Sequence, residues 1–227
     1  MKWKNLSFLT CGFVLSTTIS FIFTSVANAN SSTNLNPSLV PESGKTAQDF
    51  VPSGWKLQDK VDGDINNDRQ LDTVLILIQA GTQNDERARG LVVLVKQSNG
   101  QLRRLAVANK LLLCSSCGGL LAGPDGAGSN IEIKKGVITI SQLSGSRFAR
   151  ETKHRFWIDK SSGRLVLIGK DIFDFDRGNG DSTLVSSNYL TGQQIVEKSQ
   201  RQKVVSTKKS TIPKTKQFIE TVNIETN

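Results

Sequence analysis

Short apolar runs recur along the chain from Trp55 onward, and glycine, asparagine or aspartate bounds most of them. The runs are too short for helices, and helical periodicity over ten or more residues is nearly absent. Turn-forming pairs such as Asn99-Gly100, Lys135-Gly136 and Asn179-Gly180 separate them, as expected between strands of hairpins. The pattern predicts a mostly β, single-domain fold of antiparallel sheets with little helix. The expected strands cover 73–78, 91–95, 102–107, 111–113, 131–133, 137–140, 155–158, 165–168, 183–187 and 194–197.

The first 29 residues have the pattern of a secretory signal peptide. Lys2 and Lys4 precede a mostly apolar and hydroxylic stretch, which ends in Ala27-Asn28-Ala29, a small-x-small pattern typical of signal peptidase sites. We therefore expect export to the periplasm or the cell exterior, with no transmembrane anchor left after cleavage. An uncleaved anchor is the alternative, although its serines and threonines are unfavourable in a membrane span.

The remaining chain divides into three expected parts. Residues 30–46 are polar and aperiodic and predict a disordered leader. Residues 47–198 form the β-rich domain, beginning with a short helical turn at 47–51. Residues 199–227 predict a basic flexible tail, in which 217–222 could add an edge strand.

Basic charge is concentrated near the C-terminus. The chain has a formal net charge of +9, and its last 30 residues contain seven lysines or arginines against two glutamates. The excess of basic residues therefore belongs mainly to the tail, and we expect no nucleic-acid partner. Attraction of this tail to anionic lipid or polysaccharide is an alternative role.

An acidic loop between two expected strands is the sharpest motif. Oxygen side chains alternate at Asp64, Asn66, Asp68 and Asp72, and Gln70 can add its backbone carbonyl. Calcium takes six to eight oxygen ligands and tolerates irregular geometry. The loop predicts a structural calcium site built from these five residues.

Two departures distinguish this loop from an EF-hand. Leu75 stands where the bidentate glutamate would be, and Arg69 stands where glycine usually takes a positive φ. We expect the arginine to weaken binding or to shift the strain to Asn67. The alternative is a hairpin connector in which the aspartates and asparagines bond their own backbone.

A second acidic segment, 171–181, contains Asp174, Asp176 and Asp181. We expect a solvated loop there, with a metal site as the weaker alternative.

His154, the only histidine, is expected on the surface of a strand. No nucleophile elbow, Walker loop, dinucleotide-binding fingerprint or zinc-protease motif is present. A pair of carboxylates acting as a hydrolase remains an alternative, although aromatic residues for a sugar cleft are few.

Cys114 and Cys117 are the two cysteines beyond the expected signal peptide, in the segment Cys-Ser-Ser-Cys-Gly-Gly. In an oxidising compartment we expect them to form a structural disulfide. A redox-active dithiol, a zinc site needing two further ligands, and free thiols are the alternatives.

Residues 55–79, with the acidic loop leading into a strand, resemble the calcium loops of FG-GAP and VCBS-type repeats. The loop is also similar to that of dockerins, without the helix that follows theirs. Residues 50–197 resemble uncharacterised exported bacterial proteins that share the acidic loop, the Cys114–Gly119 segment and a late segment, 187–192. The resemblance implies export and a β fold.

We therefore expect a calcium-stabilised binding or structural module of the cell envelope or exterior. Its expected partner is a polysaccharide or a protein. An envelope hydrolase is the alternative function.

Overall fold

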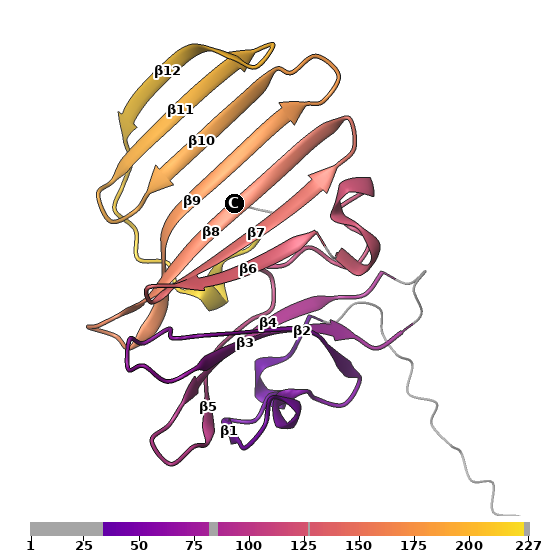
Figure 1. Ribbon diagram of the computed structural model, residues 1–227, viewed down its shortest axis with the longest axis vertical. Coiled ribbons are helices and arrows are strands. Elements are labelled where there is room, and N and C mark those ends of the chain that lie inside the picture. Colours follow the sequence, from indigo (N-terminus) through magenta and orange to yellow (C-terminus); the bar gives the residue numbers. More distant parts are fainter. Residues whose placement is uncertain (1–33, 82–85, 127, 225–227) are drawn as a thin grey trace, which may run out of the picture. The chain divides into compact units, whose positions relative to one another are not determined.

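Two antiparallel sheets make up the fold in a computed structural model that describes residues 34–81, 86–126 and 128–224. This confirms the mostly β expectation (Figure 1). The five-stranded sheet has the order β1-β5-β4-β3-β2, and the seven-stranded sheet runs from β12 to β6. The first sheet comprises β1 (Ser43–Gly44), β2 (Trp55–Gly63), β3 (Asp72–Gln79), β4 (Arg89–Lys96) and β5 (Leu102–Ala108). The second comprises β6 (Ser129–Lys134), β7 (Val137–Gly145), β8 (Phe148–Asp159), β9 (Arg164–Asp176), β10 (Ser182–Asn188), β11 (Gln193–Gln200) and β12 (Lys203–Thr211).

Short 3-10 helices complete the described secondary structure. They are η1 (Pro37–Leu39), η2 (Ala47–Phe50), η3 (Leu120–Ala122), η4 (Pro124–Gly126) and η5 (Ile219–Thr221). The second of these confirms the helical turn expected at 47–51. None of the helices in the described residues has the length and apolar character needed to cross a membrane. The expected signal peptide lies outside the described residues.

Hairpin chemistry explains how neighbouring strands connect. Lys135 and Gly136 join β6 to β7 with φ values of 52° and 75°. Two successive positive φ values give a turn whose twist matches that of the flanking strands. The turns at Asn99-Gly100 and Asn179-Gly180 likewise place a left-handed glycine between two strands. The turn signals in the sequence therefore mark the strand connections correctly.

The main core lies between the two sheets. Apolar side chains from the first sheet pack against those of β6 to β9, and the buried set includes Val74, Ile76, Leu91, Val93, Ile138, Ile140, Phe156 and Leu167. A second cluster lies on the other face of the first sheet and includes Leu35, Phe50, Leu75, Leu77, Val92 and Leu94. Strands β3 and β4 are buried on both faces, which explains their unbroken apolar runs.

The N-terminal segment differs from the disordered leader that we expected at 30–46. Its described residues, from 34 onward, form η1 and β1, and Leu35 and Val40 are buried in the second cluster. The Arg104 guanidinium donates hydrogen bonds to the carbonyls of Pro37 and Val40. The two apolar side chains cover a sheet face that would otherwise be exposed, and this outweighs the polar composition around them.

The C-terminal segment also differs from the flexible tail that we expected at 199–227. Its first part forms β12, which pairs with β11 and has every residue exposed. Its last described part returns to the main core, where Ile219 and Val222 are buried. The expected edge strand at 217–222 is instead η5 with a single bridge, Val166 to Phe218.

The apolar run 111–113 is not a strand. Leu111 and Leu112 are buried in the main core within the long connection from β5 to β6. The side chain of Gln142 takes the place of a strand partner, because it accepts a hydrogen bond from Leu113 N at 2.8 Å and donates one to Leu111 O at 2.9 Å. One buried amide thus satisfies backbone groups that a ladder would otherwise pair.

We call β10, β11 and β12 the outer strands. They continue the ladder beyond β9 (Figure 1), yet none of their residues belongs to the buried clusters formed by the described residues. The first sheet therefore packs on the parts of β6 to β9 that carry residues such as Ile138, Phe156 and Leu167, and neither cluster includes a residue of β9 beyond Leu167 or of the outer strands.

Candidate functional site

The predicted calcium ligands lie in the connection from β2 to β3. Both carboxylate oxygens of Asp64 accept backbone hydrogen bonds, from Asp68 N at 3.1 Å and from Arg69 N at 2.9 Å. The Asn66 side-chain oxygen accepts a second bond from Asp68 N at 3.0 Å, and Asp68 Oδ1 accepts one from Gln70 N at 2.8 Å. The structure thus brings Asp64, Asn66 and Asp68 to one short stretch of backbone, where they form Asx-type turns.

Asp72, the last predicted ligand, has a different role in the described structure. Its carboxylate is fully buried and accepts hydrogen bonds from Ile65 N at 2.9 Å and Lys96 N at 2.8 Å. Burial raises its pKa, and these backbone donors act in the opposite direction. Asp72 therefore ties the start of the loop to the end of β4.

The three loop aspartates do not converge closely. Within the described residues, the one group of three acidic, cysteine or histidine ligand atoms lying within 4.8 Å of one another is formed by Glu86, Cys114 and Cys117. Asp64, Asp68 and Asp72 are therefore more widely spread than such a group. The calcium site stays a prediction, in competition with the hydrogen-bonded turn.

Backbone conformation in the loop bears on the expected strain. Asn67 and Arg69 both have positive φ, at 62° and 70°. A left-handed conformation is accessible to asparagine and costly for arginine. The positive φ therefore occurs at both residues and is costly at Arg69, whereas a shift of the strain to Asn67 was one of the two outcomes we expected.

The second acidic segment is not a solvated loop over most of its length. Asp171, Asp174 and Asp176 belong to β9, and only the residues after Asp176 form the turn. Each aspartate pairs with an arginine: Asp171 with Arg155 at 2.6 Å, Asp174 with Arg150 at 2.6 Å and Asp176 with Arg147 at 3.1 Å. Cross-strand charge pairing explains this acidic pattern.

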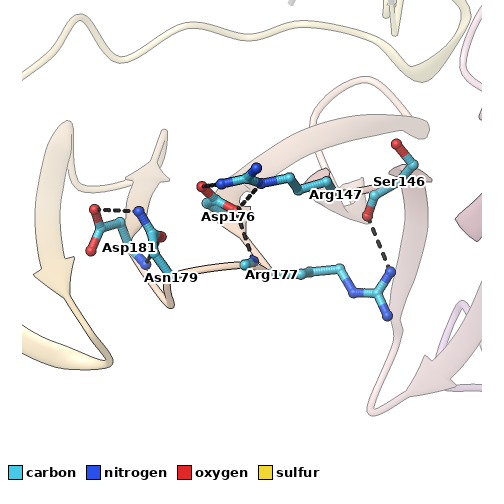
Figure 2. Close-up of polar contacts among 7 residues, drawn as sticks. Ser146, Arg147, Asp176, Arg177, Asn179 and Asp181 are labelled. Carbon is cyan, nitrogen blue, oxygen red and sulfur yellow. Dashed lines mark hydrogen bonds and ion pairs between the residues drawn. The ribbon is translucent and has the colours of Figure 1, made fainter.

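Figure 2 shows how the end of this segment is held. Asp176 accepts hydrogen bonds from the Arg147 guanidinium and from Gly178 N, and Arg177 donates to Ser146 O at 3.1 Å. Asp181 points elsewhere and accepts a bond from Asn179 Nδ2 at 3.0 Å. These contacts fasten the β7–β8 turn to the β9–β10 turn and do not direct the three predicted carboxylates at one point.

His154 is buried, so the expected surface position is wrong. Its exposed fraction is 0%, and neither ring nitrogen has a hydrogen-bond partner. Burial, together with the smaller effect of the neighbouring Lys170, lowers the pKa of His154 to about 4. Alternation along β8 places His154 on the same face as Thr152 and Phe156. In the sequence, the large apolar Phe156 two residues away was the signal that His154 faces the core.

Two buried arginines were not predicted from the sequence. Arg89 is 3% exposed, and its guanidinium donates to Gln58 Oε1 at 2.8 Å and to Ser129 Oγ at 3.0 Å. Burial lowers its pKa to about 10. Arg87 pairs with Asp125 on η4. Arg89 therefore links β4 to β2 and β6, and Arg87 attaches η4 to the residues before β4. No local pattern marks these contacts in advance.

Two hollows flank the outer strands, one on each face. The core-side hollow, of about 670 Å³, is lined by side chains that include Arg150, Asp174, Thr183 and Lys198. The far-side hollow, of about 590 Å³, is lined by residues that include Phe173, Phe175, Leu184, Glu197 and Val204. The strand registers explain the division, because residues directly opposite in the ladder share a face and successive residues alternate.

The far-side hollow combines an aromatic pair with polar groups. The Phe173 and Phe175 rings are stacked, with centroids 5.0 Å apart, and both side chains are half-buried. Asn179, Gln202 and Glu197 line the same hollow. An apolar surface with a few polar groups is typical of small-molecule and saccharide sites.

Asp176, which lines both hollows, is poorly suited to proton transfer. Hydrogen bonds from Arg147 lower the pKa of its carboxyl. A general acid needs a raised pKa near the working pH. Among the described carboxylates with a resolved shift, the raised pKa belongs to Asp72, which is buried in the acidic loop.

The structure confirms the cysteine pairing, because Cys114 and Cys117 form a disulfide with their Cα atoms 5.0 Å apart. It lies in the connection between β5 and β6, before η3. Comparison of the chain with protein-family models, with curated proteins and with solved structures found no match.

Proposed function

We propose that this chain is an exported, non-catalytic binding module that holds an envelope polysaccharide on the far side of its outer strands. The observation that carries the proposal is the far-side hollow, where the stacked Phe173 and Phe175 rings lie on a part of the sheet that no second layer covers. Half-exposed aromatic rings outside a core leave apolar surface available to a partner.

The chemistry of the hollow suits a sugar. The C–H face of a pyranose ring packs on a phenyl ring, while its hydroxyl groups need hydrogen-bond donors and acceptors around the edge. Asn179 and Gln202 offer both, and Glu197 offers acceptors. Adjacent apolar and polar groups of this kind fix the orientation of a bound ligand.

The neighbouring charges favour holding a ligand over cleaving it. The Arg150–Asp174 and Arg147–Asp176 pairs each make two parallel hydrogen bonds. The pair with Arg147 lowers the pKa of the Asp176 carboxyl and therefore opposes its use as a general acid. In this proposal the two pairs stiffen the sheet beneath the ligand, and calcium at the acidic loop contributes only to stability.

The test is retention of the purified protein on peptidoglycan, combined with calorimetry against a soluble tetramer of β-1,4-linked N-acetylglucosamine. We expect binding by the wild type and at least about tenfold weaker binding by Phe173→Ser/Phe175→Ser, because burial of each phenyl ring contributes more than one factor of ten. Phe148→Ser is the matched control, since Phe148 is 70% exposed and lines the core-side hollow.

Two results would overturn this function. The first is equal retention of the wild type and the double phenylalanine variant, with both folded by thermal melting. The second is release of shortened glycan products by the wild type, which would establish the hydrolase alternative instead.

A further inference from the structure

Glu86, Cys114 and Cys117 form a compact group away from the outer strands. A carboxylate oxygen and the two Sγ atoms all lie within 4.8 Å of one another. Cys114 is half-buried, while Cys117 and Glu86 are exposed. The group therefore presents two sulfurs and one carboxylate to solvent at a single point.

Contacts other than the disulfide hold Glu86 beside the cysteines. Ser115 N donates to Arg87 O at 2.9 Å, and Arg87 N donates to Ser115 Oγ at 2.9 Å. The Arg87 guanidinium pairs with Asp125 in the connection between β5 and β6, which also carries the two cysteines. Because these bonds join the residues next to the group, we expect the three ligand atoms to stay close when the disulfide is reduced.

The turn that carries the two cysteines is also supported independently. Cys117 N donates to Cys114 O at 3.3 Å, and Gly145 N in β7 donates to Gly118 O at 2.8 Å. A Cβ atom on Gly118 would lie 2.2 Å from the Cβ of Ala122, so close packing holds the backbone after the second cysteine. A closed turn of this spacing lets both thiolates reach one ion.

The surrounding charge suits an anionic ligand set. Two thiolates and one carboxylate would carry three negative charges. Arg89 and Lys110 line the same hollow, of about 300 Å³, as Cys114 and Cys117. Nearby cations favour the thiolate form of cysteine and reduce repulsion among the ligands.

We propose that the reduced protein binds one zinc ion through Cys114 Sγ, Cys117 Sγ and a carboxylate oxygen of Glu86, with the fourth position open to water or another ligand. Thiolate and carboxylate are both common zinc ligands, and three protein ligands with one open position are typical of a reactive zinc site.

The redox step balances with an external dithiol. The dithiol gives two electrons and two protons to the Cys114–Cys117 bond and itself becomes a disulfide. Zinc then displaces one proton from each thiol, and two Zn–S bonds and one Zn–O bond form. The oxidised protein has no thiolate to offer, so the redox state of this pair controls metal binding.

The experiment compares the oxidised protein with protein reduced by a dithiol and then desalted without oxygen. Each is titrated with zinc against a chromophoric chelator, and cobalt is used as a spectroscopic substitute. We expect one zinc ion per reduced chain, thiolate-to-cobalt absorption, and no competition by the oxidised chain. Glu86→Gln should weaken zinc binding at least about tenfold, because mutating a residue that only supports a metal ligand already weakens metal binding by about that factor.

Glu42→Gln is the matched control, because its side chain is 91% exposed and lies in the N-terminal segment. Cys114→Ser should abolish the thiolate-to-cobalt absorption, and Glu86→Gln keeps the disulfide if the serine variant fails to fold. Equal zinc affinity of the reduced and oxidised proteins would overturn the site. Equal zinc affinity of Glu86→Gln and the wild type would show that the carboxylate is not a ligand and would overturn the three-ligand site.

Discussion

The seven-stranded sheet has two parts that share one hydrogen-bond ladder and differ in what covers them. The core-facing side of β7 and β8 is apolar where the first sheet packs on it, as at Ile138, Ile140 and Phe156. Over the outer strands the same face carries polar residues such as Thr183, Gln194 and Lys198 beside Val185 and Val196. Backbone pairing therefore extends further than the core does, and burial is decided by the side chains.

The free edge of the outer strands has its own protection. Strand β12 is wholly exposed and carries Lys203, Lys208 and Lys209. Lysines on an edge strand disfavour pairing with another chain. Pairing of another chain with the edge of β12 is thus disfavoured.

The largest expected effect comes from removing the same side chain inside and outside the main core. Phe156→Ala should lower the free energy of unfolding by about 3–5 kcal/mol, because it leaves a cavity in the main core. Phe173→Ala should cost about 1 kcal/mol, since its ring is half-buried over one layer. Urea denaturation of both variants measures the difference. Equal losses would show that the surroundings of Phe173 in β9 are as tightly packed as the main core.

The pH dependence of stability is expected to come from the sandwiched part. His154 stays neutral in the folded protein down to about pH 4, whereas the unfolded chain takes up a proton below its ordinary pKa of 6.5. The stabilising contribution is therefore complete above pH 6.5 and is lost as the pH falls towards 4. The loss amounts to about 3 kcal/mol.

His154→Gln should flatten this part of the stability profile, measured by urea denaturation at several pH values. The raised pKa of Asp72 works in the opposite direction at the acidic end, because protonation of that carboxyl favours the folded state. Comparing the variant with the wild type cancels the contribution of Asp72. An unchanged slope in the variant would contradict the burial of an unpartnered neutral histidine.

Calcium should change stability less than Phe156→Ala or the titration of His154, and it should act at the acidic loop between β2 and β3. At a calcium concentration ten times Kd, binding to the folded state alone adds about 1.4 kcal/mol. Thermal melting with calcium and with a chelator measures it, and Asp64→Asn/Asp68→Asn should remove the shift. Asp181→Asn, in the β9–β10 turn, is the control and should retain it. No calcium-dependent shift in the wild type would leave the acidic loop as a hydrogen-bonded connector.

Local patterns were enough for the fold class and for much of the strand placement. Apolar runs such as 73–78 and 91–95 lie within β3 and β4, and the glycine turns join the expected neighbours. The Cys114–Cys117 pairing was also predictable, since three residues of separation bring the sulfurs together without a long-range fold. For the acidic loop, the location was predictable, whereas the mutual arrangement of its carboxylates depends on contacts with β4 through Asp72.

The errors in prediction involve residues whose partners lie far along the chain. Asp171, Asp174 and Asp176 look like loop acids until β8 and the turn before it place an arginine opposite each of them or beside it. The terminal segments look disordered because their composition is polar. A few apolar residues, Leu35 and Val40 at one end and Ile219 and Val222 at the other, nevertheless reach the two cores.

The sequence by itself determined that the chain forms β-hairpins, where most of them turn and which cysteines pair, because these properties depend on neighbouring residues. The tertiary structure decided which half of the seven-stranded sheet is covered, why His154 is buried, and how Glu86 meets the cysteines. Those outcomes depend on packing and hydrogen bonds between segments that are distant in sequence, and periodicity along one strand carries no information about what lies on its face.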